Sequence, residues 1–157
     1  TDMTDIAKNI TIQAQTTNCH IILPNDIVCA KFLKENVAYS TYESDSCPEE
    51  MMILDIGVKT QGYIKKVIDK CQTLIWNGPL GAFEIKPFDG STIEIAKYVA
   101  NNTKEGKLRS VAGGGDTVSA LKIASVENDL SYISTAGGAF LEWLEGKKLP
   151  GIESIKK

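Results

Sequence analysis

The sequence has little histidine and cysteine, and it lacks the paired motifs that bind zinc. His20 is the single histidine, and it lies directly beside Cys19, too close for the usual ligand spacings. The 4 cysteines are widely separated, and no Cys-x-x-Cys pair occurs. These absences argue against a zinc site. The 4 cysteines could make two disulfides, but a chain of 157 residues with 43% apolar content does not need them. We expect buried or half-buried free thiols in a reducing cytoplasm, with His20 as a structural residue that starts a strand.

The chain also lacks an excess of positive charge and a long apolar run. It has 17 basic and 20 acidic residues, so its net charge of −3 gives no footprint for nucleic acid or an anionic membrane. No apolar run approaches the roughly 20 residues that span a bilayer, and the polar, acidic N-terminus is unlike a signal peptide. With 157 residues, 43% of them apolar, the sequence predicts one cytoplasmic globular domain with a real core.

Apolar periodicity alternates between helix and strand along the chain, and no internal repeat is found. Helices are expected in residues 4–18, 64–71, 91–100, 117–125 and 138–145. Ser91 and Glu94 have the spacing of a capping box. Strands are expected in residues 20–24, 52–56, 73–76, 108–112 and 131–134, with short strands and an exposed loop in residues 26–50. Trp76 and Trp143 should pack in the core or between helices. This alternation predicts an α/β domain with a parallel sheet.

The most informative segment is Ser110–Thr117, where an apolar run leads into three glycines, an acid and a hydroxyl residue. Consecutive glycines let the backbone pass close to a ligand and turn N–H groups toward it. The helix that follows adds unpaired N–H donors and the positive end of its dipole. These features predict a phosphate cradle in which Asp116 holds an accompanying metal. The competing interpretation is a glycine-rich turn with Asp116 as an ordinary N-cap, and this segment alone does not decide between the two.

Two further segments have the same form. Leu74–Glu84 passes from an apolar stretch into Asn77-Gly78-Pro79, and Ile133–Glu142 passes into Gly137-Gly138. All three loops follow expected strands, and the carboxyl ends of parallel strands meet at one edge of a sheet. Because open α/β sheets bind ligands at that edge, the three loops together favour a binding site over separate structural turns.

The order and composition of these loops resemble the C-terminal half of the phosphoglycerate kinase family. The shared motifs are Trp-Asn-Gly-Pro at 76–79, Gly-Gly-Gly-Asp-Thr at 113–117 and Ser-Thr-x-Gly-Gly-Ala at 134–139. The resemblance implies a three-layer αβα, Rossmann-like parallel sheet that is incomplete. Residues 1–157 would be a partial C-terminal nucleotide-binding domain. The family's N-terminal domain, its first two nucleotide-domain strands and the lysine loop after the first of them are not found in this sequence.

The resemblance also implies an activity and the residues that serve it. The family's reaction is the reversible, Mg²⁺-dependent transfer of a phosphoryl group between ATP and the carboxylate of 3-phosphoglycerate in glycolysis. ATP or ADP would bind this chain, whereas 3-phosphoglycerate or 1,3-bisphosphoglycerate would bind through the N-terminal domain. Asp116 would be the Mg²⁺ ligand. The catalytic helix start that receives the phosphoryl group would be Ala136, Gly137 and Gly138. The implied nucleotide-binding residues are Leu54, Asn77, Ala82, Glu84, Gly113, Gly114, Gly115, Asp116 and Thr117.

The resemblance assigns these residues to different parts of the nucleotide. Gly114, Gly115 and Thr117 would contact phosphate oxygens, with Asn77 nearby. Glu84 would accept hydrogen bonds from ribose hydroxyls, and Leu54 and Ala82 would form apolar walls for adenine. The chain departs from the commonest family pattern at Ala136, where a glycine is usual, and at Val58, where a proline is frequent. The backbone N–H survives at Ala136, so we expect a small effect there. Val58 in place of proline should loosen the turn slightly and leave the chemistry untouched.

Other classes of function compete with a kinase. A non-catalytic nucleotide-binding or interaction module is favoured by the absence of half the catalytic residues. A dinucleotide-dependent oxidoreductase is disfavoured because residues 113–116 do not satisfy Gly-x-Gly-x-x-Gly, and a P-loop enzyme because no Gly-Lys-Ser/Thr occurs. We expect a monomeric full-length enzyme. The chain alone should be inactive. Because the strand ending at Trp76 exposes an open edge, the chain should dimerise, swap strands, aggregate, or stay associated with the missing segments.

Overall fold

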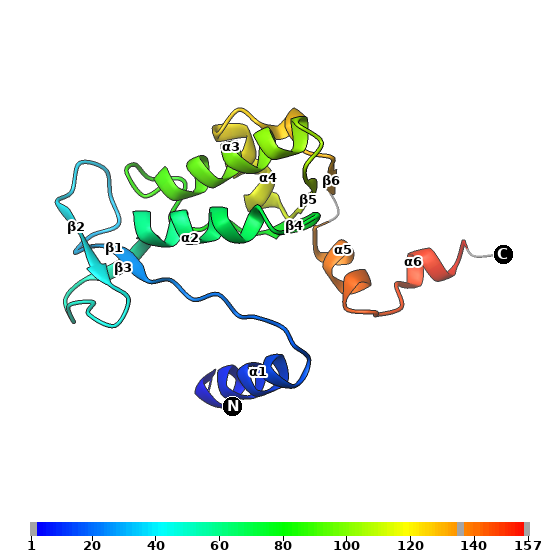
Figure 1. Cartoon of the computed structure of the whole chain (residues 1–157), viewed down its shortest axis with the longest axis horizontal. Helices are drawn as coiled ribbons and strands as arrows, with labels where there is room; N and C mark the ends of the chain where they lie inside the picture. Colours follow the sequence, from blue (N-terminus) through cyan, green and yellow to red (C-terminus); the bar gives the residue numbers. More distant parts are fainter. Residues whose placement is uncertain (1–2, 135–136, 156–157) are drawn as a thin grey trace.

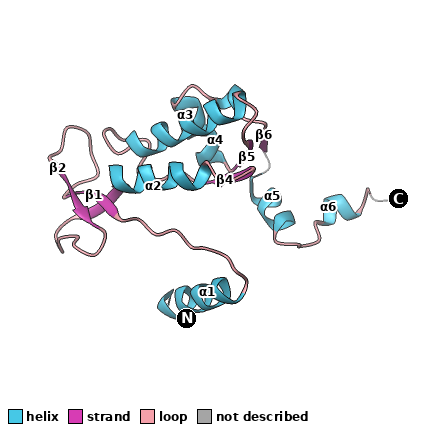
Figure 2. Cartoon of the chain, in the orientation of Figure 1, coloured by secondary structure: helices cyan, strands magenta, loops and turns pink. Residues whose placement is uncertain are grey.

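The computed structural model describes residues 3–134 and 137–155, which contain two three-stranded sheets and their helices (Figure 1). The first sheet is antiparallel, in the order β2-β1-β3, and consists of β1 Asp26–Ala30, β2 Tyr39–Glu43 and β3 Met52–Ile56. The second is parallel, in the order β4-β5-β6, and consists of β4 Thr73–Asn77, β5 Arg109–Gly113 and β6 Tyr132–Ser134. The helices (Figure 2) are α1 Met3–Thr16, α2 Val58–Ile68, α3 Gly90–Lys104, α4 Gly115–Ile123, α5 Gly137–Leu144 and α6 Pro150–Glu153, with a 3₁₀ turn at Glu127–Asp129.

The parallel sheet carries the main core on one face. Trp76 of β4 and Ala112 of β5 belong to one buried cluster with side chains of α3 and α4, such as Leu121. Because side chains alternate along a strand, the intervening residues lie on the other face, where Ile75 and Tyr132 are 50% and 59% exposed. The predicted α/β fold with a parallel sheet is therefore confirmed, with α2, α3 and α4 packed on one face and the opposite face partly open.

Helix α1 lies apart from both sheets and is joined to them by an extended segment (Figure 1). Ala14 is its only buried residue, whereas Met3, Ile6 and Ile10 are exposed. Burial of an apolar face supplies most of a helix's stability in a folded protein, so α1 contributes little to the core of this chain. Among the described residues, no helix combines the length and apolar character needed to cross a membrane.

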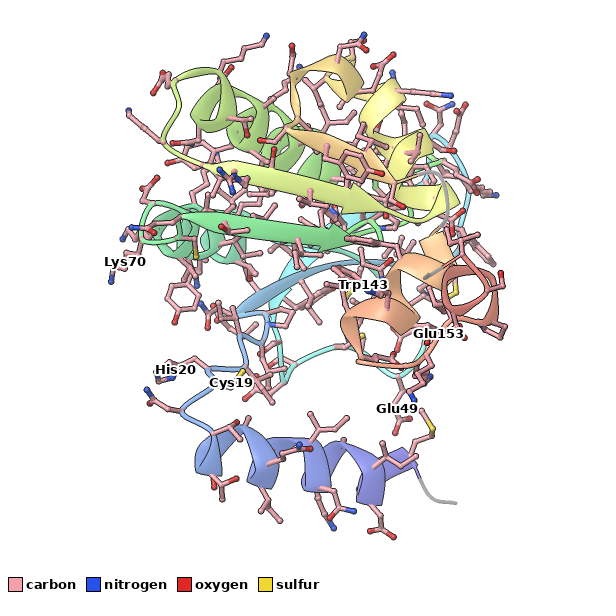
Figure 3. The ribbon with its side chains drawn as sticks, turned by 90° about the vertical axis from the view of Figure 1, so that its right-hand side faces the viewer. Cys19, His20, Glu49, Lys70, Trp143 and Glu153 are labelled. Atoms are coloured by element: carbon pink, nitrogen blue, oxygen red, sulfur yellow. The ribbon has the colours of Figure 1, made fainter. Side chains whose placement is uncertain are left out.

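The segment at residues 20–24, predicted as a buried strand, is extended but has no strand pairing. Ile21 and Leu23 are 44% and 70% exposed. Cys19 and His20 project from the same segment next to α1 (Figure 3), so the expectations of a buried thiol and a strand-starting histidine are also wrong for them. A strand needs a neighbour for its backbone hydrogen bonds, and no such neighbour lies here within the described residues. The first paired strand begins at Asp26 instead.

Two other expectations are wrong because of what surrounds the residue. The predicted capping box does not form: α3 begins at Gly90, and Ser91 instead donates its N–H to Oδ2 of Asp55 at 3.0 Å and its hydroxyl to the carbonyl of Ile56 at 2.8 Å. These buried partners already occupy Ser91. Trp143 lies in the last turn of α5 (Figure 3) and is 56% exposed. Trp76, in contrast, is in the core as predicted.

Asp26 joins the antiparallel sheet to α2. Its carboxylate accepts hydrogen bonds from the backbone N–H of Lys59 at 3.0 Å and of Thr60 at 2.8 Å, at the start of the helix. Burial alone would raise the pKa of Asp26, but the hydrogen bonds from Thr60 and Lys59 outweigh burial and hold that pKa below 3.8. Gly57 is required beside this group, because an added Cβ would lie 2.2 Å from the Asp26 carboxyl carbon.

Candidate functional site

The three glycine-rich loops leave the parallel sheet at one edge, as the sequence predicts. Asn77, the last residue of β4, is paired in register with Gly113 at the end of β5. Gly113 is in turn paired with Ser134 at the end of β6. The carboxyl ends of the three strands therefore lie side by side, at the edge where α/β sheets bind ligands.

Gly114 forms the bend between β5 and α4, and only a residue without a side chain fits there. Its φ of +97° lies in a region that L side chains rarely adopt. A Cβ added at Gly114 would lie 3.2 Å from Oδ1 of Asn77 and 3.5 Å from Oγ1 of Thr117. The backbone at the start of α4 is thus packed against two polar side chains. The helix begins at the next residue, so its first unpaired N–H groups lie at the sheet edge.

Thr117 connects the loop after β4 to the helix after β5. Its side chain is buried, and its hydroxyl oxygen accepts a hydrogen bond from the backbone N–H of Gly78 at 2.7 Å. Trp76 holds the same turn from the other side, since its indole N–H donates to the Gly78 carbonyl at 2.6 Å. The sequence analysis did not predict this positioning contact. Contact of Thr117 with a phosphate oxygen stays a prediction.

Asp116 lies in the first turn of α4, next to Gly115, and both residues are exposed. The N-cap of this helix is Gly114, so the competing interpretation of Asp116 as an N-cap is wrong. Within the described residues, the Asp116 carboxylate has no hydrogen bond or ion pair. A carboxylate at a helix start is favoured by the helix dipole and, when it has no protein partner, is free to bind a hard cation.

The loop after β4 continues from the parallel sheet to the antiparallel sheet. The N–H of Leu80 donates to Oγ1 of Thr92 at 3.1 Å, and the N–H of Ala82 donates to the carbonyl of Leu54 at 2.8 Å. Leu54 and Ala82 therefore meet, and they line one cavity of about 330 Å³ together with Ile27, Ile56, Pro79 and Leu80. Glu84 is exposed two residues after Ala82 and does not line that cavity.

Asp55 is a cavity residue that the sequence analysis missed. Its Oδ1 accepts the N–H of Ile56 at 2.8 Å, and its Oδ2 accepts the N–H of Ser91. Burial raises the pKa of Asp55 above 3.8, and the nearby Asp89 adds to this effect, while the hydrogen bonds oppose it only in part. A signal was present in the sequence, because Asp55 interrupts the apolar run Met52–Ile56 just before a glycine.

The predicted catalytic helix start is described only in part. Ala136 lies outside the described residues, whereas Gly137 and Gly138 form the start of α5, which follows β6. Phe140 of this helix packs at the end of β5, since its Cδ1 would be 3.0 Å from a Cβ added at Gly113. Helix α5 therefore begins near the bend that leads into α4.

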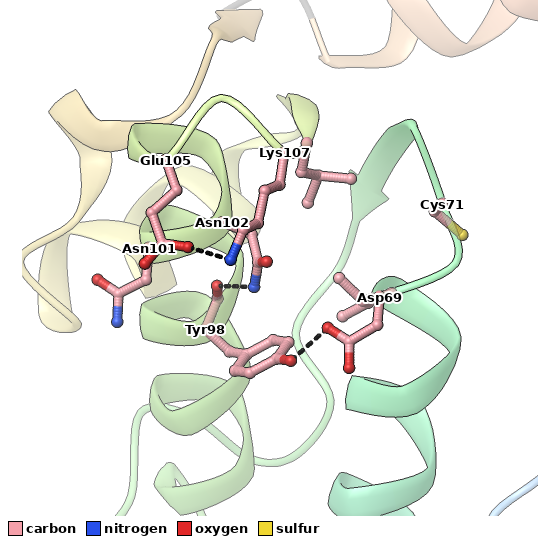
Figure 4. A pocket seen from close by; sticks show the side chains of 9 residues that line it. Asp69, Cys71, Tyr98, Asn101, Asn102, Glu105 and Lys107 are labelled. Carbon is pink, nitrogen blue, oxygen red and sulfur yellow. Dashed lines mark hydrogen bonds and ion pairs between the residues drawn. The ribbon is translucent and has the colours of Figure 1, made fainter.

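A larger cavity of about 600 Å³ lies at the opposite end of the parallel sheet, where α2 and α3 end and β4 and β5 begin (Figure 4). Four of its polar side chains form two pairs. The hydroxyl of Tyr98 donates to Asp69, and Nζ of Lys107 lies 2.6 Å from a carboxylate oxygen of Glu105. The hydrogen bond to Asp69 raises the pKa of Tyr98. None of the predicted site residues lines this cavity.

The fold and the grouped strand ends define an α/β protein whose candidate binding edge is built from glycine-rich turns and the start of a helix. A sequence model of the phosphoglycerate kinase family matches residues 1–147, and the chain belongs to that family. It is 53% identical over 156 residues to phosphoglycerate kinase of Chelativorans sp. (strain BNC1) and 54% identical over 151 residues to that of Rhizobium leguminosarum bv. trifolii (strain WSM2304). These alignments cover 99% and 96% of this chain but 39% and 38% of the two relatives.

Solved structures agree with this membership. The structure of phosphoglycerate kinase from Coxiella burnetii superimposes with a TM-score of 0.87 at 38% identity, covering 95% of this chain and 38% of that one. Phosphoglycerate kinase from Pyrococcus horikoshii OT3 gives a TM-score of 0.78 at 24% identity, which supports the fold alone. The chain thus spans about two fifths of the length of its relatives.

Proposed function

We propose that this chain supplies the nucleotide-binding part of a phosphoglycerate kinase, which transfers a phosphoryl group reversibly between Mg²⁺-bound ATP and the carboxylate of 3-phosphoglycerate in the glycolysis of the cytoplasm. The observation that carries the proposal is the grouping of Asn77, Gly114 and Thr117 at the start of α4, with the unpaired carboxylate of Asp116 beside them. Membership of the phosphoglycerate kinase family supports the choice of this reaction. Catalysis of phosphoryl transfer consists mainly of positioning and charge neutralisation, and this arrangement suits both.

The residues at this helix start fit a phosphate with an accompanying Mg²⁺. The unpaired N–H groups of the first turn of α4 are donors for phosphate oxygens, and Gly114 and Gly115 leave room for a close approach. Among the described residues, no group of three or more potential metal-binding side chains occurs. Asp116 would therefore hold Mg²⁺ together with oxygens of the nucleotide, and the metal would supply charge neutralisation of the phosphates.

The other parts of the nucleotide are assigned to the loop after β4. The cavity lined by Leu54 and Ala82 is apolar apart from Asp55, which suits one face of an adenine ring. Glu84 would accept hydrogen bonds from the ribose hydroxyls. The start of α5, at Gly137 and Gly138 with Ala136 before them, would present N–H groups to the phosphoryl group during transfer. The 3-phosphoglycerate would bind to parts of the protein outside this chain.

Calorimetric titration with ADP, with and without Mg²⁺, and with NAD tests the binding half of the proposal. We expect ADP to bind more tightly with Mg²⁺, and the Mg²⁺-dependent part of the affinity to disappear in Asp116→Ala. Asp5→Ala is the matched control, because Asp5 is also an exposed acid in the first turn of a helix, far from the site. Glu84→Gln should weaken the binding of ADP by roughly 1.5–3 kcal/mol, the value of one charged hydrogen bond. The same substitution should change the affinity for inorganic triphosphate less.

The outcomes separate the candidate functions. Tighter binding of NAD than of Mg²⁺-ADP would indicate a dinucleotide-binding protein instead. For the kinase itself, a coupled assay on the full-length protein should lose almost all turnover in Asp116→Ala. Mg²⁺-ADP binding by a full-length protein that has no turnover would favour the alternative of a non-catalytic nucleotide-binding or interaction module.

A further inference from the structure

Two cysteines far apart in the sequence face each other beside the antiparallel sheet. Cys29 lies in β1, the central strand, and is fully buried. Cys47 is half-buried in the segment that leads from β2 to β3. Their sulfur atoms are 3.6 Å apart, although 18 positions separate the residues in the chain. A disulfide bond requires about 2.05 Å, so a shift of roughly 1.5 Å would bring the two sulfurs to bonding distance.

The surroundings of the two cysteines allow Cys47 to move, whereas Cys29 is fixed. Cys29 is held in place, because β1 pairs with Ser40 of β2 on one side and with Ile53 of β3 on the other. Cys47 is in a turn segment, where its Sγ lies 3.6 Å from the carbonyl of Pro48 and 3.7 Å from that of Met51. These carbonyls are weak partners for a thiol, so rotation of Cys47 toward Cys29 breaks no strand pairing.

The two thiols differ in reactivity. Burial, followed by the neighbouring thiol, raises the pKa of Cys29 to about 11, which keeps Cys29 as a protonated thiol near neutral pH. Cys47 is the more accessible of the pair, and oxidants react with the accessible thiolate. The geometry therefore provides an entry residue, Cys47, and a resolving residue, Cys29, already in contact with it.

We propose that Cys29 and Cys47 form a reversible disulfide under peroxide. The Cys47 thiolate attacks one peroxide oxygen, the O–O bond breaks, and hydroxide leaves and takes a proton to become water. The sulfur of Cys29 then attacks the resulting sulfenic sulfur, the S–O bond breaks, and the Cys29 proton leaves with that hydroxide as a second water. Two thiols are oxidised and one peroxide is reduced to two waters. A dithiol such as dithiothreitol restores the thiols.

The Cys29–Cys47 disulfide would be a covalent cross-link to β1. It would fasten the segment after β2 to the central strand at the level where β1 pairs with β3, the strand that carries Leu54. Oxidation would therefore stiffen the sheet that forms one wall of the 330 Å³ cavity. Formation of this disulfide depends only on the two thiols and the sheet, so the proposal holds whether or not the cavity binds adenine.

The test uses the full 157-residue chain with Cys19→Ser and Cys71→Ser, which leaves only the proposed pair. After treatment with hydrogen peroxide, we expect loss of both thiols, a monomer on a non-reducing gel and full recovery in dithiothreitol. Trypsin cleaves after Lys31 and Lys34, between the two cysteines, so the disulfide joins two peptides that mass spectrometry identifies. The reaction should be slower in denaturing urea, where the folded chain no longer holds the sulfurs together.

Control variants make the result decisive. The complementary chain with Cys29→Ser and Cys47→Ser keeps Cys19 and Cys71 and should form no internal disulfide. Adding Cys47→Ser to the test chain should leave Cys29 as an unreacted thiol. Four results would overturn the proposal: thiols that resist peroxide, a disulfide between chains, a sulfinic acid on Cys47 beside a free Cys29, or equal rates in buffer and urea.

Discussion

Replacement of Gly114 by alanine is the sharpest perturbation of the candidate site. At φ +97° an alanine is strained, and its Cβ would lie 3.2 Å from Oδ1 of Asn77 and 3.5 Å from Oγ1 of Thr117. Holding a side chain in such a sparsely populated backbone region costs on the order of 1–3 kcal/mol. The tight contact with Asn77 adds to that cost unless the amide moves. We therefore expect Gly114→Ala to lower the free energy of unfolding by about 1–3 kcal/mol.

The same substitution should also weaken the binding of ADP. The chain can relieve the strain only by moving the bend, and the bend positions the first N–H groups of α4. Urea denaturation gives the stability, with an unchanged slope as evidence that only stability has changed. Calorimetric titration with Mg²⁺-ADP gives the affinity, measured where the variant is still folded.

Gly62→Ala is the matched control. Gly62 is exposed inside α2, and an added Cβ meets nothing within 4 Å. This change should raise stability by roughly 0.5–1 kcal/mol, because alanine is the better helix former, and should leave ADP affinity unchanged. The reasoning about Gly114 is refuted if Gly114→Ala keeps wild-type stability and affinity, or if it behaves like Gly62→Ala.

Two further predictions follow from the fold. Asp26→Asn should lower the free energy of unfolding at pH 7 by roughly 1.5–3 kcal/mol, the value of one charged hydrogen bond. Because the pKa of Asp26 is lowered in the folded state, its contribution is present above the unfolded-state pKa and is lost as pH falls below 3.8. Urea unfolding across that range should show the two proteins converging, and a constant difference would contradict the assignment. At the open edge of the parallel sheet, Ile75→Lys should reduce self-association of the chain in sedimentation velocity, whereas Val58→Lys, which replaces an exposed apolar residue on α2, should not. Equal effects of the two lysines, or a wild-type chain that sediments as a monomer, would rule out pairing through β4.

The sequence was sufficient for elements whose signal is local. The stripe through Ile64, Val67, Ile68 and Cys71 predicts a helix over residues 64–71. The helix found there, α2, runs from Val58 to Ile68, so it starts earlier than predicted and Cys71 lies beyond its end. The glycine after α3 predicts the end of that helix, and Gly106 adopts a φ of +72°. The carboxyl-edge arrangement also follows from local signals. Each loop comes directly after a strand, and parallel pairing brings the strand ends together.

Three of the wrong predictions concern partners that the sequence does not reveal. Residues 20–24 have the composition of a strand, but pairing needs a second strand at hydrogen-bonding distance. Ser91 and Glu94 have capping-box spacing, but Asp55 and the carbonyl of Ile56 bind Ser91 first. Trp143 is apolar enough for a core, but its side chain on α5 is left 56% exposed by the elements around it.

The geometry of the helix gives Asp116 and Thr117 different surroundings, although they are neighbours in the sequence. Asp116 and Thr117 are adjacent in one motif, yet successive residues of a helix point about 100° apart. That rotation buries Thr117 against Gly78, where its hydroxyl fixes the turn after β4, and leaves Asp116 exposed at the helix start. The motif alone could not show this division, because both residues bear oxygens suited to a phosphate or a metal. Because the Thr117 hydroxyl is hydrogen-bonded to the turn after β4, its loss should weaken ADP binding both with and without Mg²⁺. The loss of Asp116 should remove only the part of the ADP affinity that depends on Mg²⁺.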